Sequence, residues 1–465
     1  MRNPTIEDIY RINSMSRVKG LSVTTDSDGH TYVLGQFFKN MFAGDIYQEA
    51  TESAVFLAQL DSNSGNWKWS TIIYEYSGDN NFTASGEITY HRGFLYSAMV
   101  INNRGLIVKT NRSGIVQYSK SFTGTTLESL ISISLDKAGN LYLVNSFSGV
   151  ITFHPHTLSS VQTTGYVTKL SPTGEFLWAK SVENSSENTI SNSNLNDIVT
   201  AKDGTSYVIG RFIGTIILGN MILEGRPNNP MDFLLAEIDT AGNWTRLKAF
   251  PNGQGTSIDR DKEGNLYIVG GFLNQFKLGG SKIKSEGINL FVAKLDTKLL
   301  VDWVVSTKYD SDIVQNIANI IVDQNNCYIN GFFNQPISFG HNVLVPSSIS
   351  NNDCKGFKTS EFVAKLSDEG EWLGSYQIDG IDSTANSKNL AVSRQIDHRS
   401  FDLLRNESNR SDSLKEGSNR KQSKNVWITG GFGEKLEVNR DHHQSDKILT
   451  QYTPKTALFL IRSLL

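Results

Sequence analysis

A chain of 465 residues with a formal net charge of −3 and a pI near 6.3 has no general attraction for nucleic acid or anionic membranes. Its 39 glycines and nine prolines are typical of many short strands joined by tight turns, and they exclude a proline-rich disordered chain. No run approaches the roughly 20 apolar residues of a membrane helix, and residues 1–8 contain no apolar signal core. We therefore expect no membrane insertion and no classical secretion, which leaves an intracellular or virus-particle location.

One short pattern recurs seven times along the chain. An aromatic residue is followed by glycine three positions later and by phenylalanine five positions later. The clear copies are Tyr32/Gly35/Phe37, Tyr207/Gly210/Phe212, Tyr267/Gly270/Phe272, Tyr328/Gly331/Phe333 and Trp427/Gly430/Phe432, while Tyr142/Phe147 has Asn145 for glycine and Tyr96 keeps only the aromatic residue. A fixed repeat of this length predicts units that share their core with their neighbours, as in a propeller.

In chain order, the first predicted strand lies at residues 8–16, before the first complete repeat. The cleanest repeat, 254–309, predicts four strands at 256–259, 266–272, 290–296 and 301–306, with a glycine turn at 261–265. Four antiparallel strands per repeat predict a blade. The approximate blades are 18–76, 84–126, 127–187, 188–251, 252–309, 310–381 and 382–465.

The last repeat reaches its third strand at 458–462 and then nearly reaches the end of the sequence. We expect the strand at 8–16 to supply its fourth strand, because closing the ring removes exposed sheet edges. The sequence thus predicts an all-β fold: one domain over 1–465, a seven-bladed β-propeller of four-stranded antiparallel blades closed by an N-terminal strand.

Two repeats depart from the pattern. The second is short, and the other six carry an extra hairpin, which would build a raised rim if the hairpins fall on one side. The last contains the insertion 383–424, rich in charged residues and poor in apolar ones, which predicts a mobile surface loop. Residues 394–424 hold eight basic and five acidic side chains. This segment is either an arm for an acidic partner or, as we favour, a solvated linker.

The repeat resembles the SBBP-type β-propeller repeat, a relative of NHL-type propellers. Residues 261–272 carry the resemblance best, through Asp261, Gly264, Asn265, Tyr267 and the glycine and phenylalanine that follow, together with 291–296. The resemblance implies a propeller and no particular activity, since such repeats occur mostly in uncharacterised proteins of bacterial surfaces and large DNA viruses.

Several residue groups could carry chemistry. Aspartates recur in the turns at Asp26, Asp136, Asp203, Asp261 and Asp323. They offer calcium too few carboxylates per turn, so we expect them to accept hydrogen bonds from turn amides. His154 and His156 could share a metal, with His442 and His443 far away in sequence, but no third ligand is evident, and we expect surface histidines.

Six of the seven tryptophans lie on or beside predicted fourth strands: Trp67, Trp69, Trp178, Trp244, Trp303 and Trp372. Aromatic side chains can stack on sugars, but repetition at one blade position favours packing between blades. Hairpin residues Phe42, Phe153, Ile217, Phe276 and Phe339 are candidate contacts that we expect to pack under their hairpins. Cys327 and Cys354 are more consistent with two free thiols than with a bonded pair.

No catalytic, cofactor-binding or metal-binding residue is assigned, and no cofactor is expected. The function predicted is a non-enzymatic binding or scaffold propeller with an unidentified protein partner and without nucleic acid, and one form of this function is a structural or surface component of a larger particle. The alternatives are a carbohydrate-binding propeller and a propeller lyase or hydrolase with its site at a channel mouth.

Overall fold

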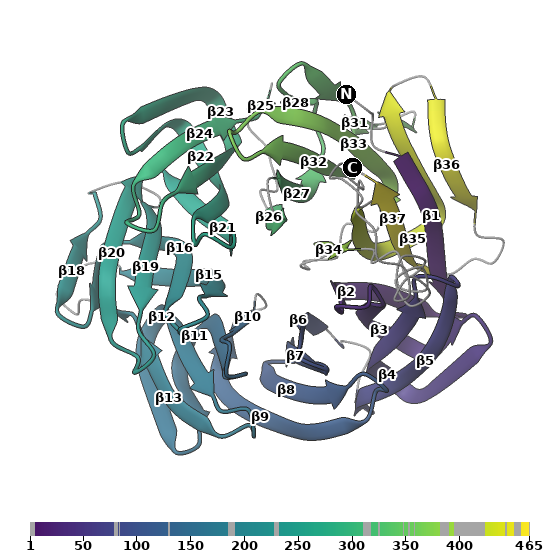
Figure 1. The fold of residues 1–465 in the computed structure, drawn as a ribbon, viewed down its shortest axis with the longest axis horizontal. Coiled ribbons are helices and arrows are strands. Elements are labelled where there is room, and N and C mark those ends of the chain that lie inside the picture. Colours follow the sequence, from purple (N-terminus) through teal and green to yellow (C-terminus); the bar gives the residue numbers. More distant parts are fainter. Residues whose placement is uncertain are drawn as a thin grey trace, which may run out of the picture.

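A computed structural model of the chain describes residues 5–78, 82, 84–128, 131–184, 191–226, 232–309, 318–323, 326–346, 348–351, 354–357, 359–381, 390–394, 424–441, 444–450 and 457–464. Every regular element among them is a β-strand, and the strands follow one another around a central opening (Figure 1). Antiparallel groups of strands set around one axis define a β-propeller. The predicted all-β propeller fold is confirmed at this level.

The first three groups of four strands, here called units, are contiguous in sequence. The first unit comprises β2 (Arg17–Thr25), β3 (Thr31–Ala43), β4 (Ile46–Asp61) and β5 (Asn66–Tyr76). The second comprises β6 (Ala84–His91), β7 (Phe94–Ile101), β8 (Arg104–Asn111) and β9 (Val116–Leu127). The third comprises β10 (Ser132–Leu135), β11 (Leu141–Phe153), β12 (His156–Leu170) and β13 (Phe176–Ser181).

The next three units follow the same order, and short strands are added between the members of the fourth and sixth units. The fourth comprises β15 (Asn192–Thr200), β16 (Ser206–Ile213), β19 (Asp232–Ile238) and β20 (Trp244–Pro251). The fifth comprises β21 (Gly253–Arg260), β22 (Leu266–Leu278), β23 (Ser281–Leu295) and β24 (Val301–Ser306). The sixth comprises β26 (Ala318–Asp323), β27 (Asn326–Phe333), β32 (Ser360–Ser367) and β33 (Trp372–Ile381).

The added strands form three small sheets. One contains β14 (Glu183–Asn184), β17 (Thr215–Leu218) and β18 (Met221–Glu224). The second contains β25 (Lys308–Tyr309), β28 (Ile337–Phe339) and β29 (Asn342–Leu344), and the third contains β30 (Ser348–Asn351) and β31 (Cys354–Phe357).

The remaining strands come from both ends of the chain. They are β34 (Leu390–Arg394), β35 (Lys424–Asp441) and β37 (Ala457–Leu464), with β36 (Gln444–Thr450) paired to β35 and β1 (Thr5–Asn13) paired to β37. The pairing of β1 with β37 is antiparallel and places Ile12 opposite Leu458. Ile12 and Leu460 are both fully buried against Val18 and Phe37 of the first unit.

Part of the predicted insertion 383–424 is a strand. Leu390–Arg394 forms β34 and pairs with β35, with Leu390 opposite Ile428. The prediction of a loop was wrong for this segment, because a short apolar stretch can complete a sheet whose partner strand lies far away in sequence. Residues 395–423 lie outside the described part of the chain.

The fifth unit illustrates how the sequence produces these strands. Leu266–Leu278 is rich in β-branched and aromatic residues and is buried over its first seven positions, as a strand covered on both faces should be. The turn before it contains Gly264, whose φ of 96° only glycine adopts without strain. Val301–Ser306 forms β24 with the predicted bounds, and the predicted strand at 256–259 extends to Gly253–Arg260.

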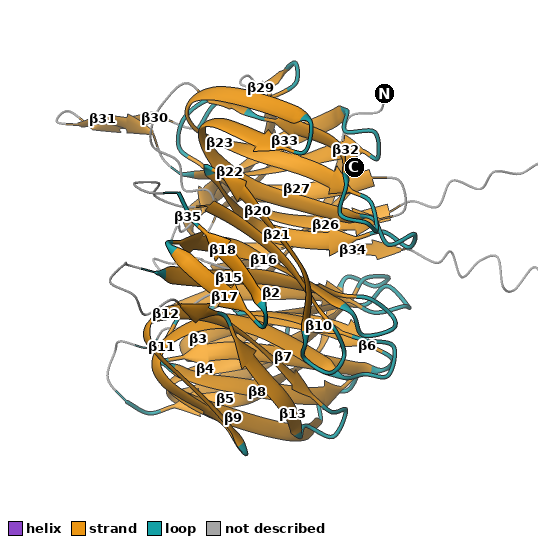
Figure 2. Cartoon of the chain, turned by 90° about the vertical axis from the view of Figure 1, so that its left-hand side faces the viewer, coloured by secondary structure: helices purple, strands orange, loops and turns teal. Residues whose placement is uncertain are grey.

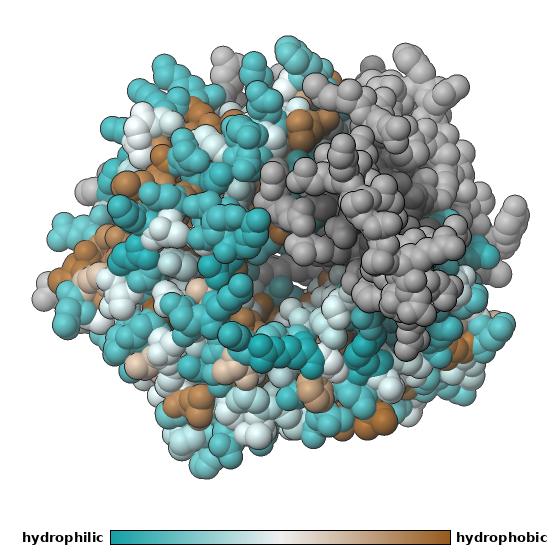
Figure 3. Space-filling model, viewed as in Figure 1, coloured by the Kyte–Doolittle hydropathy of each residue, from teal (hydrophilic) through white to brown (hydrophobic). Residues whose placement is uncertain are grey.

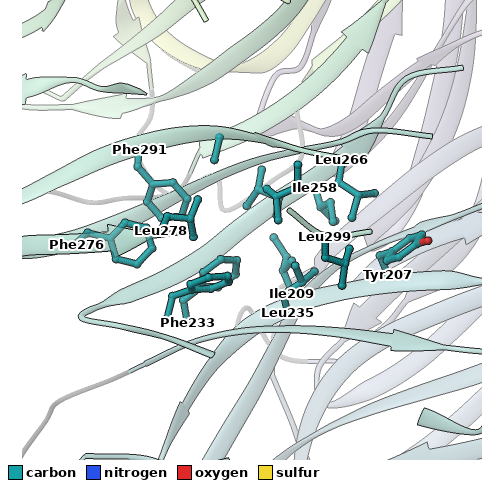
Figure 4. Close-up of a cluster of buried hydrophobic side chains, with 14 of the residues drawn as sticks. Tyr207, Ile209, Phe233, Leu235, Ile258, Leu266, Phe276, Leu278, Phe291 and Leu299 are labelled. Atoms are coloured by element: carbon teal, nitrogen blue, oxygen red, sulfur yellow. The ribbon is translucent and has the colours of Figure 1, made fainter. Parts of the chain in front are cut away.

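The hydrophobic core is divided among the spaces between neighbouring units. Between the fourth and fifth units, Ile209 and Leu235 pack against Ile258 and Leu266. Figure 4 shows this cluster, with Phe233, Phe276 and Phe291 gathered at one end and Tyr207 at the other. Similar clusters fill the other described interfaces. Since each unit supplies half of two cores, no unit has a complete core alone.

The units share one orientation, so the ring has two different faces. First-to-second and third-to-fourth strand turns, such as 26–30 and 61–65, lie on one face, here called the turn face, at the right of Figure 2. Second-to-third strand hairpins begin at the opposite face. Figures 1 and 3 look onto the turn face, where hydrophilic residues surround the central hollow.

The hairpins do not all project from the ring as the raised rim that the sequence suggested, although β30 and β31 extend away from it at the left of Figure 2. In the first unit, Gln48 Nε2 donates to the carbonyl of Ser70 in β5, and in the sixth, Asn342 Nδ2 donates to that of Ser375 in β33. These two hairpins therefore fold back against the outer strands of their own units. Figure 1 places β18 outside β20, at the circumference of the ring.

Candidate functional site

The innermost strands enclose a cavity of about 400 Å³ along the ring axis. Its described wall comes from β2, β6, β10, β15, β21 and β26, one strand from each of six units. The carboxyl groups of Glu87, Asp197 and Asp259 lie in this wall, and no lysine or arginine does among its described residues. The cavity is therefore acidic.

Polar side chains of β2, β6, β10, β15 and β21 accept hydrogen bonds from backbone amides of the next unit. Ser22 Oγ accepts from Ile88 N at 3.2 Å, Glu87 Oε2 from Ile133 N at 2.9 Å, and Ser134 Oγ from Thr200 N at 2.9 Å. An inner strand is a sheet edge whose outward amides have no strand partner. The side chains of the preceding unit satisfy these amides.

Asp197 is the most connected member of this network. Its carboxylate accepts from Ser132 Oγ of the third unit at 2.5 Å, and from Ser257 Oγ and Ile258 N of the fifth unit at 2.6 and 2.8 Å. It is 3% exposed. One buried side chain of the fourth unit therefore joins the units on both sides of it, and hydrogen bonds to a charged group are among the stronger ones.

Asp259 continues the network and has an unusual titration. Its Oδ2 accepts from Val322 N at 2.7 Å and its Oδ1 from Arg260 N at 2.8 Å. Desolvation raises its pKa to about 7, although these amides oppose the shift. In the same wall, desolvation lowers the pKa of His91, followed by repulsion from Arg92. The cavity thus contains one carboxyl group that titrates near neutral pH.

The inner-strand network was missed by the sequence analysis. Its signal is a serine or acidic residue at alternating positions of the strand before each glycine turn, as at Ser132 and Ser134 or Ser257 and Asp259. The pattern resembles that of any half-exposed strand, and only the neighbouring unit shows that the side chains have partners.

Four of the five turn aspartates, Asp26, Asp136, Asp203 and Asp261, accept hydrogen bonds from turn amides as predicted, and the turn after Asp323 lies outside the described residues. Asp26 Oδ1 accepts from the amides of Asp28 and His30, and Asp136 Oδ1 from that of Asn140, all at 2.9 Å. Asp261 Oδ1 accepts from Asn265 N at 2.8 Å. Among the described residues no group of three or more His, Cys, Asp or Glu side chains could hold a metal ion.

Three tryptophans pack between units, as the sequence suggested. Trp69, Trp178 and Trp303 donate through Nε1 to carbonyls of Arg112, Thr240 and Asp368, in a third-to-fourth strand turn farther along the ring. A left-handed glycine of that turn lies against each indole: Gly114, Gly242 and Gly370. In two of these contacts a lysine opposite the tryptophan on the neighbouring strand donates to the same carbonyl. Lys169, opposite Trp178, donates to that of Thr240, and Lys294, opposite Trp303, donates to that of Asp368. These indoles are used for packing and leave little for sugar stacking.

The remaining candidates are dispersed. His154 is exposed at the tip of the β11–β12 hairpin, beside His156, and His442 and His443 lie outside the described residues. Cys327 is buried and free, in agreement with the free-thiol prediction for that residue. Nothing here describes the side chain of Cys354.

The hairpin phenylalanines are packed rather than exposed, as predicted. Phe153, Phe276 and Phe339 are at most 2% exposed. Each packs on an aromatic residue in the buried part of the third strand, with ring centroids 5.1, 4.6 and 4.9 Å apart. Phe42 and Ile217 are half-buried.

Other apolar side chains of the hairpins are exposed instead. They occur in five units, and are here called the hairpin patch residues: Tyr47, Val150, Val161, Ile222, Leu273 and Val343. Val161 is 98% exposed and Ile222 is 63% exposed. In Figure 3 hydrophobic residues lie at the left edge of the ring, where Figure 1 places β18.

Comparisons with known proteins find solved structures that are similar to this chain, all at low sequence identity. No family model matches the chain, and no curated protein does either. The chain is similar to the solved structure of the Dos1 propeller, with 10% identity over 99% of this chain and 95% of that one, at a TM-score of 0.42. It is also similar to the phage phi92 endosialidase, with 10% identity over 98% of this chain and 69% of that one, at a TM-score of 0.40.

A third similar structure is a variant of the Synechocystis apocarotenoid oxygenase, with 11% identity over 97% of this chain and 93% of that one, at a TM-score of 0.36. At such scores we draw no functional argument from these structures. Within the described residues, no helix is long and apolar enough to cross a membrane.

Proposed function

We propose that the chain is a seven-bladed, SBBP-type propeller that acts as a non-enzymatic protein-binding scaffold through its outer hairpins. The observation that carries this proposal is the recurrence of exposed apolar side chains on hairpins of five units. Scattered exposed apolar residues are ordinary, but these occupy the same kind of element around one circumference. Loops and hairpins on a rigid scaffold are where binding residues concentrate.

The side chains of the axial cavity differ from those of the hairpins, because they already have partners within the ring. Asp197, Asp259 and Glu87 accept hydrogen bonds from backbone amides of neighbouring units. Side chains that stabilise the ring in this way are constrained in their orientation, and so are less able to reorient around a substrate. The circumference, rather than the axis, is therefore the proposed contact surface.

The test compares two sets of exposed apolar residues. A triple variant, Tyr47→Ser, Ile222→Ser and Val343→Ser, should lose a protein partner captured from an extract of the source cells. The matched control, Ile115→Ser with Leu300→Ser, changes residues of the turn face that are 61% and 58% exposed and should keep it. Quantitative mass spectrometry measures both, and equal capture by the two variants contradicts the proposal.

Ring closure by the N-terminal strand is part of the proposal, and the eight residue pairs between β1 and β37 support it. Deleting residues 1–13 removes β1 and exposes the edge of β37 as well as Val18 and Phe37. We expect loss of cooperative thermal unfolding, followed by circular dichroism. Deleting residues 1–4 alone should leave the melting temperature unchanged. An unchanged melting temperature after deletion of residues 1–13 would contradict ring closure by β1.

A second candidate is a lyase or hydrolase with its site in the axial cavity. Asp259 favours it, because a carboxyl group with a pKa of about 7 in a cavity suits general acid–base chemistry. Any such activity should follow an apparent pKa near 7 and disappear in Asp259→Asn. A folded Asp259→Asn protein with full activity would exclude this residue as the acid or base.

A further inference from the structure

A second, smaller cavity lies on the turn face between the fourth and fifth units. Its volume is about 250 Å³, and it is lined by Ala201, Lys202 and Asp203 of one unit and by Arg260, Asp261 and Lys262 of the next. It therefore lies between the first-to-second strand turns of two neighbouring units.

The two aspartates of this cavity are committed to their own turns. Asp261 Oδ1 and Oδ2 accept from the backbone and side-chain nitrogens of Asn265, at 2.8 and 2.7 Å. Asp203 Oδ1 accepts from Thr205 N at 3.0 Å. These hydrogen bonds hold the carboxylates in the turns, and among the described residues neither carboxylate forms an ion pair within 4 Å with Lys202, Arg260 or Lys262.

Among the described residues, Nε of Arg260 has no acceptor. This Nε is buried, and the guanidinium makes no ion pair within 4 Å in the described part of the chain. By contrast, Arg112 on the same face is held by both Asp26 and Asp28, at 2.7 and 2.6 Å. A buried donor without a partner in the chain is rare, so this Nε is available to an acceptor from outside the chain.

The neighbouring carboxyl group does not replace that acceptor. Asp259 uses both oxygens on backbone amides, and its pKa of about 7 leaves it partly protonated at neutral pH. Lys202 and Lys262 occupy the same position of consecutive turns and are exposed, with Lys262 paired loosely to the exposed Glu263 at 3.4 Å. Three cations thus surround one open cavity.

We propose that this cavity binds a phosphate group, free or esterified to a small molecule. A guanidinium presents parallel donors that match two oxygens of a phosphate. Arg260 lines this cavity, and no described residue uses its Nε. Lys202 and Lys262 close the site from two adjacent turns as mobile point charges. The site lies on the turn face and is separate from the hairpin patch residues.

The test is calorimetric titration of the full chain with inorganic phosphate at constant ionic strength, with chloride as the reference salt. We expect saturable binding that weakens by about tenfold or more in Arg260→Ala, which corresponds to about 1.4 kcal/mol. Lys202→Ala should weaken binding by a smaller factor. Melting temperatures of the variants without phosphate show whether each one folds.

Lys137→Ala is the matched control, because Lys137 occupies the same turn position in the third unit, is exposed, and does not line the cavity. Its affinity for phosphate should equal that of the unaltered chain. Absence of saturable binding, unchanged affinity in Arg260→Ala, or equal weakening by Lys137→Ala would each overturn the proposal. The last result would mean that the ion senses only general positive charge.

A parallel titration with methyl phosphate distinguishes the two sources of the ligand group. Affinity within a fewfold of that for inorganic phosphate assigns the site to an esterified phosphate whose organic part extends into solvent. Binding that is weaker by about tenfold assigns it to the free ion. If the chain binds no phosphate but still captures its protein partner, the phosphate site is rejected and the scaffold proposal stands.

Discussion

The fifth and sixth units are built alike but bury different chemistry on the face that each turns toward the next unit. In the fifth, Val269 and Leu290 are buried among apolar side chains of the sixth. The equivalent positions of the sixth unit hold Asn330 and Glu361, which are 1% and 0% exposed. One interface is therefore a plain apolar core, and the other contains a carboxyl group.

The polar version has its own internal partners. Glu361 Oε1 accepts from Asn330 Nδ2 at 2.6 Å, and Asn330 Oδ1 accepts from Asn319 Nδ2 at 3.3 Å. Glu361 Oε2 has no hydrogen-bond partner among the described residues. Desolvation raises the pKa of Glu361 to about 8, with the Asn330 hydrogen bond opposing it. The same arrangement of strands thus accommodates either an apolar or a polar interface, but only the polar interface contributes a stability that depends on pH.

The largest expected effect is on the pH dependence of the unfolding free energy, which a substitution of Glu361 should remove. Because the folded pKa of Glu361 lies above its ordinary value of 4.5, the folded state binds the proton more tightly, so stability is lost as pH rises from about 4.5 to about 8. The slope approaches about 1.4 kcal/mol per pH unit. Glu361→Gln keeps an acceptor for Asn330 and cannot ionise. Urea denaturation should show the variant more stable than the unaltered chain at pH 9 and similar at pH 5.

A double variant, Asn330→Val with Glu361→Leu, gives the sixth unit side chains like those of the fifth. Its unfolding free energy should lose the pH dependence that Glu361 contributes, and replacing buried polar groups by packed apolar ones is often neutral or stabilising. An unchanged slope between pH 5 and pH 9 in both variants would show that Glu361 does not titrate as described.

The next effect concerns Phe362, the neighbour of Glu361 on the opposite face of β32. Phe362 is fully buried and packs against Phe339 with centroids 4.9 Å apart. Phe362→Ala should lower the unfolding free energy by about 3–5 kcal/mol. Because no ionisable group is removed, the loss should be equal at pH 5 and pH 9. A loss confined to one pH would contradict the assignment of the two faces.

The smallest expected loss of stability comes from substituting Gly370, at the outer edge of the interface between the fifth and sixth units. Gly370 has a φ of 84°, and a Cβ built there would lie 2.9 Å from Trp303 of the fifth unit. Gly370→Ala should cost about 1–2 kcal/mol from backbone conformation alone, with more from the indole contact, measured as a shift in the denaturation midpoint. Gly280→Ala is the control, because a Cβ there meets nothing within 4 Å.

The sequence was a good guide to the fold because its signals are local. The aromatic–glycine–phenylalanine phrase lies on the second strand, and glycines such as Gly264 sit in the turns where φ is positive. The fate of the hairpins was not predictable in the same way. Their direction depends on contacts such as Gln48 with Ser70, which form only after the strands are placed.

The candidate sites depended even more on neighbouring units. Nothing near Arg260 in sequence indicates that its guanidinium lacks an acceptor, since Asp259 and Asp261 flank it. Only the folded chain shows that both carboxylates are engaged elsewhere. The buried pair of Asn330 and Glu361 lies 31 residues apart in sequence and likewise has no local signal.

The hydrogen bonds around the axial cavity have a consequence for amide exchange with solvent. The amides of Ile88, Ile133, Thr200 and Ile258 belong to sheet edges beside a cavity large enough for water, where exchange should be fast. Each is instead bonded to a side chain of the unit before it. These amides should exchange slowly and at a common rate, because separating any two units frees the amide between them. Their exchange would therefore report opening of the ring itself, as distinct from fraying of any single sheet.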